Sequence, residues 1–147
     1  MNVIEAIKDV LVAQNVGKFG SSPPVSNTDW RIFLHHQPVS PDRAITLYAT
    51  GGSAPNPRWR MDYPSIQVCC RAEQNNPNGA YNKAVEVQNA LLGISYFDVA
   101  NYGRINSVAM AGGIVKLGPD ENGRVPFVVN LNLITEPTAT DQRDQLP

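Results

Sequence analysis

Hydrophobic and polar positions near the start of the chain alternate with the spacing of an amphipathic helix. Apolar residues recur at intervals of three and four with charged residues between them: Val3, Ile4, Ile7, Val10 and Leu11 on one side, and Glu5, Lys8 and Asp9 on the other. This spacing is typical of a helix with one buried face. Asn2 is suited to cap its start, and Gly17 is expected to end it because glycine accepts left-handed backbone angles.

Period-two alternation predicts three strands in the middle of the chain. Residues 30–36 and 44–50 both alternate, and the short turn at 38–42 between them favours an antiparallel hairpin. A third strand is expected from Pro64 to Arg71. The intervening segment, residues 51–63, is predicted to be a long loop, and a loop of that length within a compact domain is usually functional or mobile.

The second half of the chain predicts another helix and at least two more strands. Asn75 or Asn76 is expected to cap the helix, with Pro77 in its first turn and Gly93 at its end. Residues 101–110 are expected to form a strand, although their alternation is weak, and residues 114–117 are expected to extend it. After the turn signal Asn122-Gly123, residues 127–134 alternate most clearly of all.

This order of elements predicts an α+β fold, a mostly antiparallel sheet of four to five strands with two helices packed on one face. We expect residues 1–136 to form a single domain. Residues 137–147 are expected to form a flexible C-terminal tail, because residues 138–147 contain almost no apolar side chains.

Composition narrows the possible functions. The chain has 147 residues, with 12 Lys and Arg against 13 Asp and Glu, so the formal net charge is −1. That balance argues against a dedicated nucleic-acid binder, which normally carries a basic face.

No run approaches the roughly 18 apolar residues that a membrane span needs. The first residues lack the pattern of a signal peptide, so we expect cytosolic synthesis and no membrane partner.

The reactive side chains show no catalytic or metal-binding pattern. His35 and His36 are neighbours in a predicted strand and project oppositely, so they cannot share one metal without distortion. Cys69 and Cys70 are adjacent in the same way, and we expect no disulfide between them. Paired carboxylates, a phosphate-binding glycine loop and a nucleophile elbow are all missing from the sequence. We therefore predict no catalytic residue, no cofactor, no metal and no enzymatic activity.

Arg58, Trp59 and Arg60 are the strongest interaction candidates, because Trp and Arg are enriched at binding hot spots. One alternative has Trp59 folded back over the sheet edge with both arginines solvated. Another has the arginines on DNA phosphates and Trp59 stacked on a base. Asn130 and Asn132 share the polar face of the last strand, which is either solvated or buried in a wet subunit interface. Arg71 is the remaining interface candidate.

Several motifs in order carry a resemblance to a known family. A strand that begins Tyr63-Pro64 ends in Arg71, and a helix rich in Ala and Val follows it and ends in Leu91-Leu92-Gly93. Residues 117–124 then have the sequence Leu-Gly-Pro-Asp-Glu-Asn-Gly-Arg. A final alternating strand ends at Glu136-Pro137. This arrangement resembles the tail terminator, or minor capsid (tail completion), proteins of long-tailed bacteriophages. It covers about half of the chain, and no motif of the family matches residues 51–62.

The resemblance implies a structural virion protein at the neck, made in the host cytoplasm. It implies a homohexameric ring that closes the head-proximal end of the tail tube. The ring would contact the tail tube protein on one side and a head-completion (stopper) protein on the other, and DNA would pass through it without sequence-specific contact. Two alternatives stay open: another neck component, either head completion or adaptor, and a small nucleic-acid-binding module that uses the Arg58-Trp59-Arg60 loop.

Overall fold

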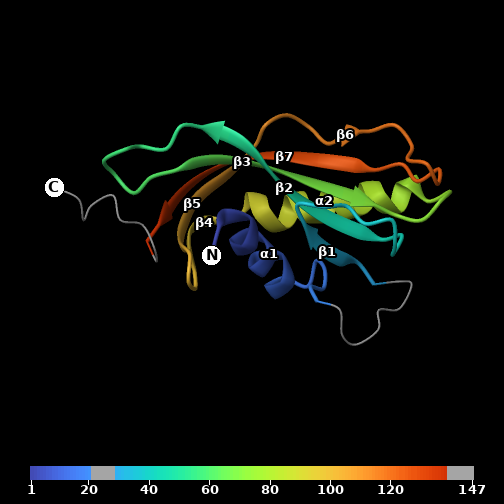
Figure 1. Ribbon diagram of the computed structural model, residues 1–147, viewed down its shortest axis with the longest axis horizontal. Coiled ribbons are helices and arrows are strands. Elements are labelled where there is room, and N and C mark those ends of the chain that lie inside the picture. The colour runs from blue at the N-terminus through green and yellow to red at the C-terminus, as the bar shows by residue number, and fades with distance from the viewer. Residues whose placement is uncertain (21–28, 139–147) are drawn as a thin grey trace.

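A computed structural model describes residues 1–20 and 29–138 (Figure 1). Its helices and strands follow the order α1 Val3–Ala13, β1 Arg31–Leu34, β2 Ala44–Ser53, β3 Tyr63–Arg71, α2 Pro77–Leu92, β4 Ser95–Val99, β5 Gly103–Met110, β6 Val115–Lys116 and β7 Phe127–Pro137. The strands form one sheet in the order β1-β2-β3-β7-β5-β4, and β6 pairs with β7 beyond the end of β5. The predicted α+β class is thereby confirmed.

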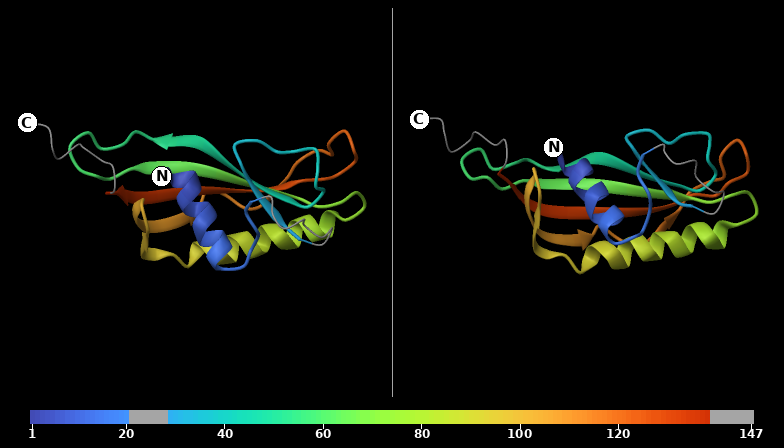
Figure 2. Two further views of the ribbon diagram at one scale, coloured as in Figure 1. Left: turned by 60° about the horizontal axis from the view of Figure 1, so that its bottom comes forward. Right: turned by 90° about the horizontal axis from the view of Figure 1, so that it is seen from below.

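Both helices lie on the same side of the sheet, α2 along the strands and α1 across them (Figure 2). The centre of the sheet packs against α2, which contacts β3, β7 and β5. The sheet curls, so that α1 reaches β1 and β2 on one side and β4 on the other. Alternate strand residues fill the space between the layers and are almost fully buried: Ile45, Leu47, Ile66, Val68, Cys70, Val129, Leu131 and Leu133.

The sheet is larger than predicted and mixed, with seven strands in place of four to five. β1 and β2 run parallel, with Arg31 opposite Ala44 and Leu34 opposite Leu47, so the predicted antiparallel hairpin is wrong. Alternation is the same in either direction and cannot distinguish them. The chain turns at His35, which has a φ of +64°, and returns to the start of β1 before β2 begins.

β4 was missed because its sequence lacks alternation. Ser95, Tyr96, Phe97 and Asp98 are all exposed, and only Val99 is buried. The strand forms a tight antiparallel hairpin with β5 through residues 100–102 and lies at the edge of the sheet. Residues 114–117 do extend the ladder of β5 as expected, since Val115 pairs with Val128.

The predicted loop over residues 51–63 is shorter in the structure. β2 continues to Ser53 through a bulge between Ala49 and Gly52, and β3 already begins at Tyr63. Gly52 has a φ of +89°, and a Cβ at this position would lie 2.3 Å from the carbonyl oxygen of Tyr63. Only glycine fits this close approach of two strands, so the Gly-Gly pair that suggested a loop belongs to the sheet.

The N-terminus of α1 is capped as the sequence predicts. The Asn2 side chain accepts a hydrogen bond from the Glu5 N–H at 2.9 Å, and the Glu5 carboxylate accepts one from the Asn2 N–H at 3.1 Å. The other end differs from the prediction, because the helix stops at Ala13 and Asn15 takes the left-handed turn with a φ of +59°. Gly17 lies against Ile32, where a Cβ would come within 2.9 Å of that side chain.

Removing the cap tests this local structure. Asn2→Ala is expected to lower the free energy of unfolding by about 1 kcal/mol, because the Glu5 N–H in the first turn loses the side chain that accepts its hydrogen bond. Urea denaturation followed by circular dichroism measures the change. Asn82→Ala is a matched control, since Asn82 is exposed within α2 and alanine there should be neutral or slightly stabilising. Equal losses in both variants would contradict the capping role.

The C-terminal end of the described chain is held by hydrogen bonds. β7 runs to Pro137, and the Thr138 N–H donates to the Tyr102 carbonyl at 2.9 Å. Residues 139–147, which make up most of the predicted flexible tail, lie outside the described residues. Neither described helix has the length and apolar character needed to cross a bilayer.

Candidate assembly surfaces

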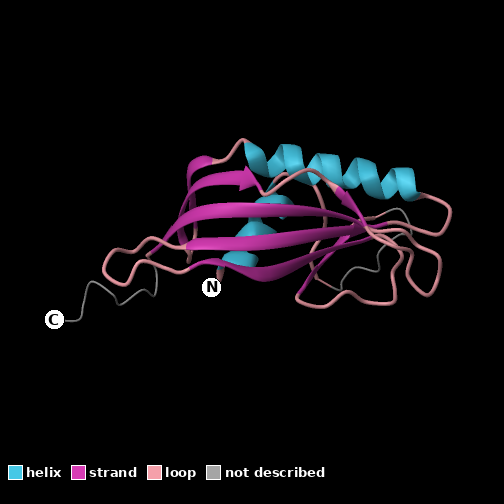
Figure 3. Ribbon diagram, turned by 90° about the horizontal axis from the view of Figure 1, so that it is seen from above, coloured by secondary structure: helices cyan, strands magenta, loops and turns pink. Residues whose placement is uncertain are grey.

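A loop between β2 and β3 projects from one end of the sheet (Figure 3). We call residues 54–62 the hairpin tip. The Asn56 side chain accepts hydrogen bonds from the backbone N–H groups of Arg58 and Trp59, both at 2.9 Å, and the Asn56 N–H donates to the Met61 carbonyl at 3.0 Å. At its base, Asp62 exchanges two backbone hydrogen bonds with Thr135. These contacts give the tip a defined shape.

The hairpin tip presents its aromatic side chain to solvent. Trp59 is 64% exposed, Arg58 is exposed and Arg60 is half-buried. Trp59 therefore does not fold back over the sheet edge, which was one alternative left by the sequence. An exposed Trp beside an exposed Arg on an ordered loop has the composition of a binding hot spot.

Asn130 and Asn132 lie on the sheet face away from the helices, and each is hydrogen-bonded across to β3. Gln67 donates to the Asn130 side chain at 3.1 Å, and Ser65 donates to the Asn132 side chain at 2.6 Å. Asn130 is half-buried and Asn132 is exposed. The middle of this face is thus a row of neutral polar groups held in fixed orientations.

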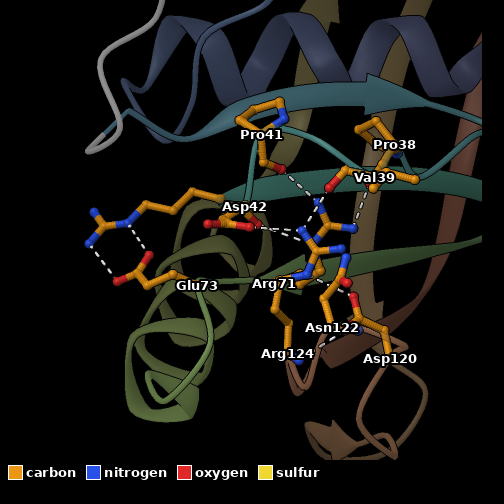
Figure 4. Close-up of polar contacts among 10 residues, drawn as sticks. Pro38, Val39, Pro41, Asp42, Arg71, Glu73, Asp120, Asn122 and Arg124 are labelled. Carbon is orange, nitrogen blue, oxygen red and sulfur yellow. Dashed lines mark hydrogen bonds and ion pairs between the residues drawn. The ribbon is translucent and has the colours of Figure 1, made fainter.

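Arg71 occupies a different position from the other candidates, because it is 2% exposed. Its guanidinium donates to the backbone carbonyls of Pro38 at 2.6 Å, Pro41 at 2.6 Å and Asp42 at 3.1 Å (Figure 4). Arg71 therefore holds the connection between β1 and β2 and presents almost no surface of its own.

Arg124 holds the same connection from the other side and was not singled out from the sequence. Its side chain is 4% exposed and donates to the Val39 carbonyl at 2.7 Å and to the Asp42 and Asp120 carboxylates, each at 2.9 Å. Desolvation alone would raise the pKa of Asp120. Hydrogen bonds from the Arg124 and Asn122 N–H groups and from the Arg124 guanidinium outweigh it and lower that pKa.

Together the two arginines fix residues 38–42, which we call the pinned loop. Four of its carbonyls accept from buried guanidinium groups, while the Val39 side chain at its tip is 75% exposed. These contacts explain how β2 returns alongside β1 in the parallel direction. They also leave an apolar side chain presented on a rigid loop, at the other end of the sheet from the hairpin tip (Figure 1).

A bidentate ion pair closes the pinned loop on its α2 side. The Arg43 guanidinium donates to both Glu73 oxygens, at 2.9 Å and 3.1 Å, and the Asn76 amide donates to Glu73 at 2.6 Å. The hydrogen bond from Arg43 lowers the pKa of Glu73 from 4.5 to about 2.

This ion pair predicts a stability change in acid. A carboxyl whose pKa is lower in the folded state contributes stability that is present above its unfolded pKa and is lost as the pH falls through its folded pKa. The wild-type protein should exceed Glu73→Gln in free energy of unfolding above about pH 4.5, and the difference should vanish toward pH 2. Urea titrations at intervals of pH measure it. A difference independent of pH would contradict the assignment.

Neither the thiols nor the histidines form a reactive site. Cys69 and Cys70 are free and buried, and desolvation raises both pKa values, that of Cys69 to about 11. Cys70 belongs to the core. His35 and His36 are both exposed at the end of β1. Among the described residues, no group of three or more His, Cys, Asp and Glu side chains is placed to hold a metal ion.

A comparison with protein families places the chain among known proteins. Residues 9–137 match a family model described as bacteriophage tail terminator protein. The chain belongs to the bacteriophage tail terminator family. The match includes residues 51–62, which the sequence motifs left uncovered. A search of curated proteins found no match.

Membership assigns the terminator to the structural proteins of the phage virion, as a component of the tail. It also means that the terminator associates with other tail or head components. The ordered motifs of the sequence were therefore informative although each one is structural. The turn motif at residues 117–124 contains Asp120 and Arg124, so part of the resemblance reflects the cluster that fixes the pinned loop.

Proposed function

We propose that the terminator assembles as a closed ring, a homohexamer, on the head-proximal end of the tail tube and joins the tube to the head-completion protein. Family membership is the observation that carries this proposal. The protein is made in the host cytoplasm and acts at the neck of the virion. DNA passes through the ring without sequence-specific contact, and the protein performs no catalysis and needs no cofactor.

The arrangement of the exposed loops supports contact with two partners at once. The hairpin tip and the pinned loop lie at opposite ends of the sheet (Figures 1 and 3). One carries Trp59 and Arg58, and the other carries Val39, the most exposed of the large apolar side chains among the described residues. In this proposal one end contacts the tail tube protein and the other contacts the head-completion protein.

The neutral polar row on the outer sheet face is proposed to lie in a wet interface within the assembly. The amides of Asn130 and Asn132 retain free donors and acceptors after bonding to Gln67 and Ser65. Interfaces of this kind hold bridging water in numbers similar to their direct hydrogen bonds. Arg71 acts differently, through the pinned loop that it holds.

Assembly on tubes tests the proposal directly. Purified protein mixed with tail tubes is expected to give ring-sized masses by native mass spectrometry and to bind tube ends. Labelled protein on tube ends, and not on filled heads, separates a terminator from a head-completion or adaptor protein. A strict monomer that never associates with tubes would contradict the ring.

A second candidate function uses the same hairpin tip to bind single-stranded nucleic acid. The exposure of Trp59 next to Arg58 favours it, since bases stack on aromatic side chains beside cations. It predicts oligonucleotide affinity that falls steeply with salt. Trp59→Ala with undiminished oligonucleotide affinity would remove this candidate.

A further inference from the structure

The turn between β6 and β7 contains the Asn122-Gly123 pair, which lies outside the surfaces proposed for assembly. We propose that Asn122 is a site of spontaneous deamidation, and that its isoaspartyl product releases Arg124 from the pinned loop. The proposal does not depend on the ring or on its partners, because it concerns the chemistry of one turn within a single copy.

An Asn-Gly pair supplies both reacting groups. The backbone nitrogen of Gly123 gives up its proton to solvent and attacks the side-chain carbonyl carbon of Asn122. The new C–N bond closes a five-membered succinimide, while the amide nitrogen of Asn122 takes up a proton and leaves as ammonia. Water then opens the ring at one of its two carbonyls, which gives aspartate or isoaspartate. Glycine favours the first step because it has no Cβ to obstruct the attack.

The structure leaves this turn open to the reaction. Glu121, Asn122 and Gly123 are all exposed, and Gly123 has a φ of +73°. The Gly123 N–H donates to the Asp120 carbonyl at 3.0 Å, and this hydrogen bond must open before the nitrogen can attack. Exposed turns with few buried contacts open at a small fraction of the cost of global unfolding. Solvent and base therefore reach the reacting nitrogen while the rest of the chain stays folded.

A second Asn-Gly pair, Asn78-Gly79, lies in the first turn of α2 and is expected to resist the reaction. The Gly79 N–H donates to the Asn76 side chain at 3.1 Å as part of the helix cap. The Asn76 amide also covers Gly79, where a Cβ would lie 2.4 Å from it. Helix α2 packs against β3, β5 and β7, so its first turn would have to unwind from the sheet. The two pairs have the same sequence, and it is their structural setting that selects Asn122.

The isoaspartyl product changes the backbone that positions Arg124. Its main chain runs through the former side chain of residue 122, which adds one methylene before residue 123. In the native turn the Asp120 carboxylate accepts hydrogen bonds from the Asn122 and Arg124 N–H groups and from the Arg124 guanidinium, each at 2.9 Å (Figure 4). The longer chain cannot keep all three. Because the same guanidinium donates to the Val39 carbonyl at 2.7 Å, the pinned loop loses one of its two anchors.

Incubation of the full chain at mildly alkaline pH, followed by digestion in mild acid and peptide mapping, tests the site. Peptides that contain Asn122 should gain the mass of an amide-to-acid conversion and separate into aspartyl and isoaspartyl forms. Peptides that contain Asn78 should remain unconverted. In urea, where the helix cap is lost, both pairs should convert. No conversion at Asn122 in the folded chain, or equal conversion at Asn78, would overturn the proposal.

Two variants test the effect on the pinned loop. Asn122→Gln retains an exposed amide but cannot close the five-membered ring, and Asn122→Asp, freshly prepared, supplies the aspartyl product without the extra methylene. Amide hydrogen exchange in residues 38–42 should become faster in the isoaspartyl fraction of the incubated wild-type chain. It should stay at the starting rate in incubated Asn122→Gln and close to it in Asn122→Asp. Unchanged exchange in the isoaspartyl fraction, or equally faster exchange in incubated Asn122→Gln, would overturn the release of Arg124.

Discussion

Replacing Arg71 with methionine is expected to lower the free energy of unfolding by about 3 kcal/mol or more. The substitution keeps most of the apolar volume and removes the donors to the carbonyls of Pro38, Pro41 and Asp42. Those acceptors would remain at a buried position without partners. Urea denaturation of the purified variant measures the loss. Amide hydrogen exchange should also become faster in residues 38–42, because their anchor is gone.

Two further variants separate the effect of losing the hydrogen-bond donors of the Arg71 guanidinium from the effect of losing its positive charge. Arg71→Lys keeps the charge, but one ammonium cannot reproduce the planar guanidinium that reaches three carbonyls, so most of the loss should remain. Arg58→Met makes the same chemical change at an exposed position and should alter stability by less than about 0.5 kcal/mol. A loss below about 1 kcal/mol for Arg71→Met would show that the pinned loop is held by other contacts.

Trp59→Ala is expected to weaken assembly by about 2 kcal/mol or more, which is roughly a thirtyfold loss of affinity for the partner of the hairpin tip. The folded monomer should be unaffected to within about 0.5 kcal/mol, because Trp59 is 64% exposed. Binding to tube ends by sedimentation, measured alongside urea denaturation, gives both quantities.

The exposed Tyr96→Ala variant provides a comparison at another surface of the sheet. Its binding to tube ends through the hairpin tip should be unchanged, because Tyr96 lies on β4 and outside residues 54–62. Unchanged assembly in Trp59→Ala would exclude the hairpin tip as a contact but would not contradict the proposed ring. Loss of monomer stability in Trp59→Ala would instead show that the side chain supports the fold.

Alternation predicted the strands that are buried on one face and failed where burial does not alternate. β3 and β7 were found because every second side chain enters the core, as with Ile66 and Leu131. β4 was missed because its first four side chains are exposed. The extension of β2 was missed because Gly51-Gly52 indicates a loop locally, whereas the bulge depends on the opposing strand.

The direction of β1 relative to β2 depends on residues distant in sequence. Arg71 lies at the end of β3 and Arg124 in the turn before β7, and both bind the connection at residues 38–42. Nothing in the local pattern of that connection predicts a buried guanidinium. The sequence did identify Arg71, but as an interface candidate. A Pro-rich connection, combined with an arginine at the end of an apolar strand, was the available signal for Arg71, and Arg124 had none.

The hairpin tip shows the opposite case, in which composition alone was informative. Trp59 between two arginines on a Pro-bounded segment suggested a contact, and the structure exposes Trp59 on an ordered loop. Composition could not predict the order of that loop, because it depends on the Asn56 side chain and on the pairing of Asp62 with Thr135. The β4 edge gave no signal, since edge position is a property of the whole sheet.

Electron microscopy of phage particles made without this protein tests the central claim most directly. A terminator that closes the head-proximal end of the tube predicts tails of abnormal, mostly excessive length that are not joined to filled heads. Supplying the wild-type chain should restore uniform, attached tails. Particles with tails of normal length firmly attached to heads in its absence would contradict the account.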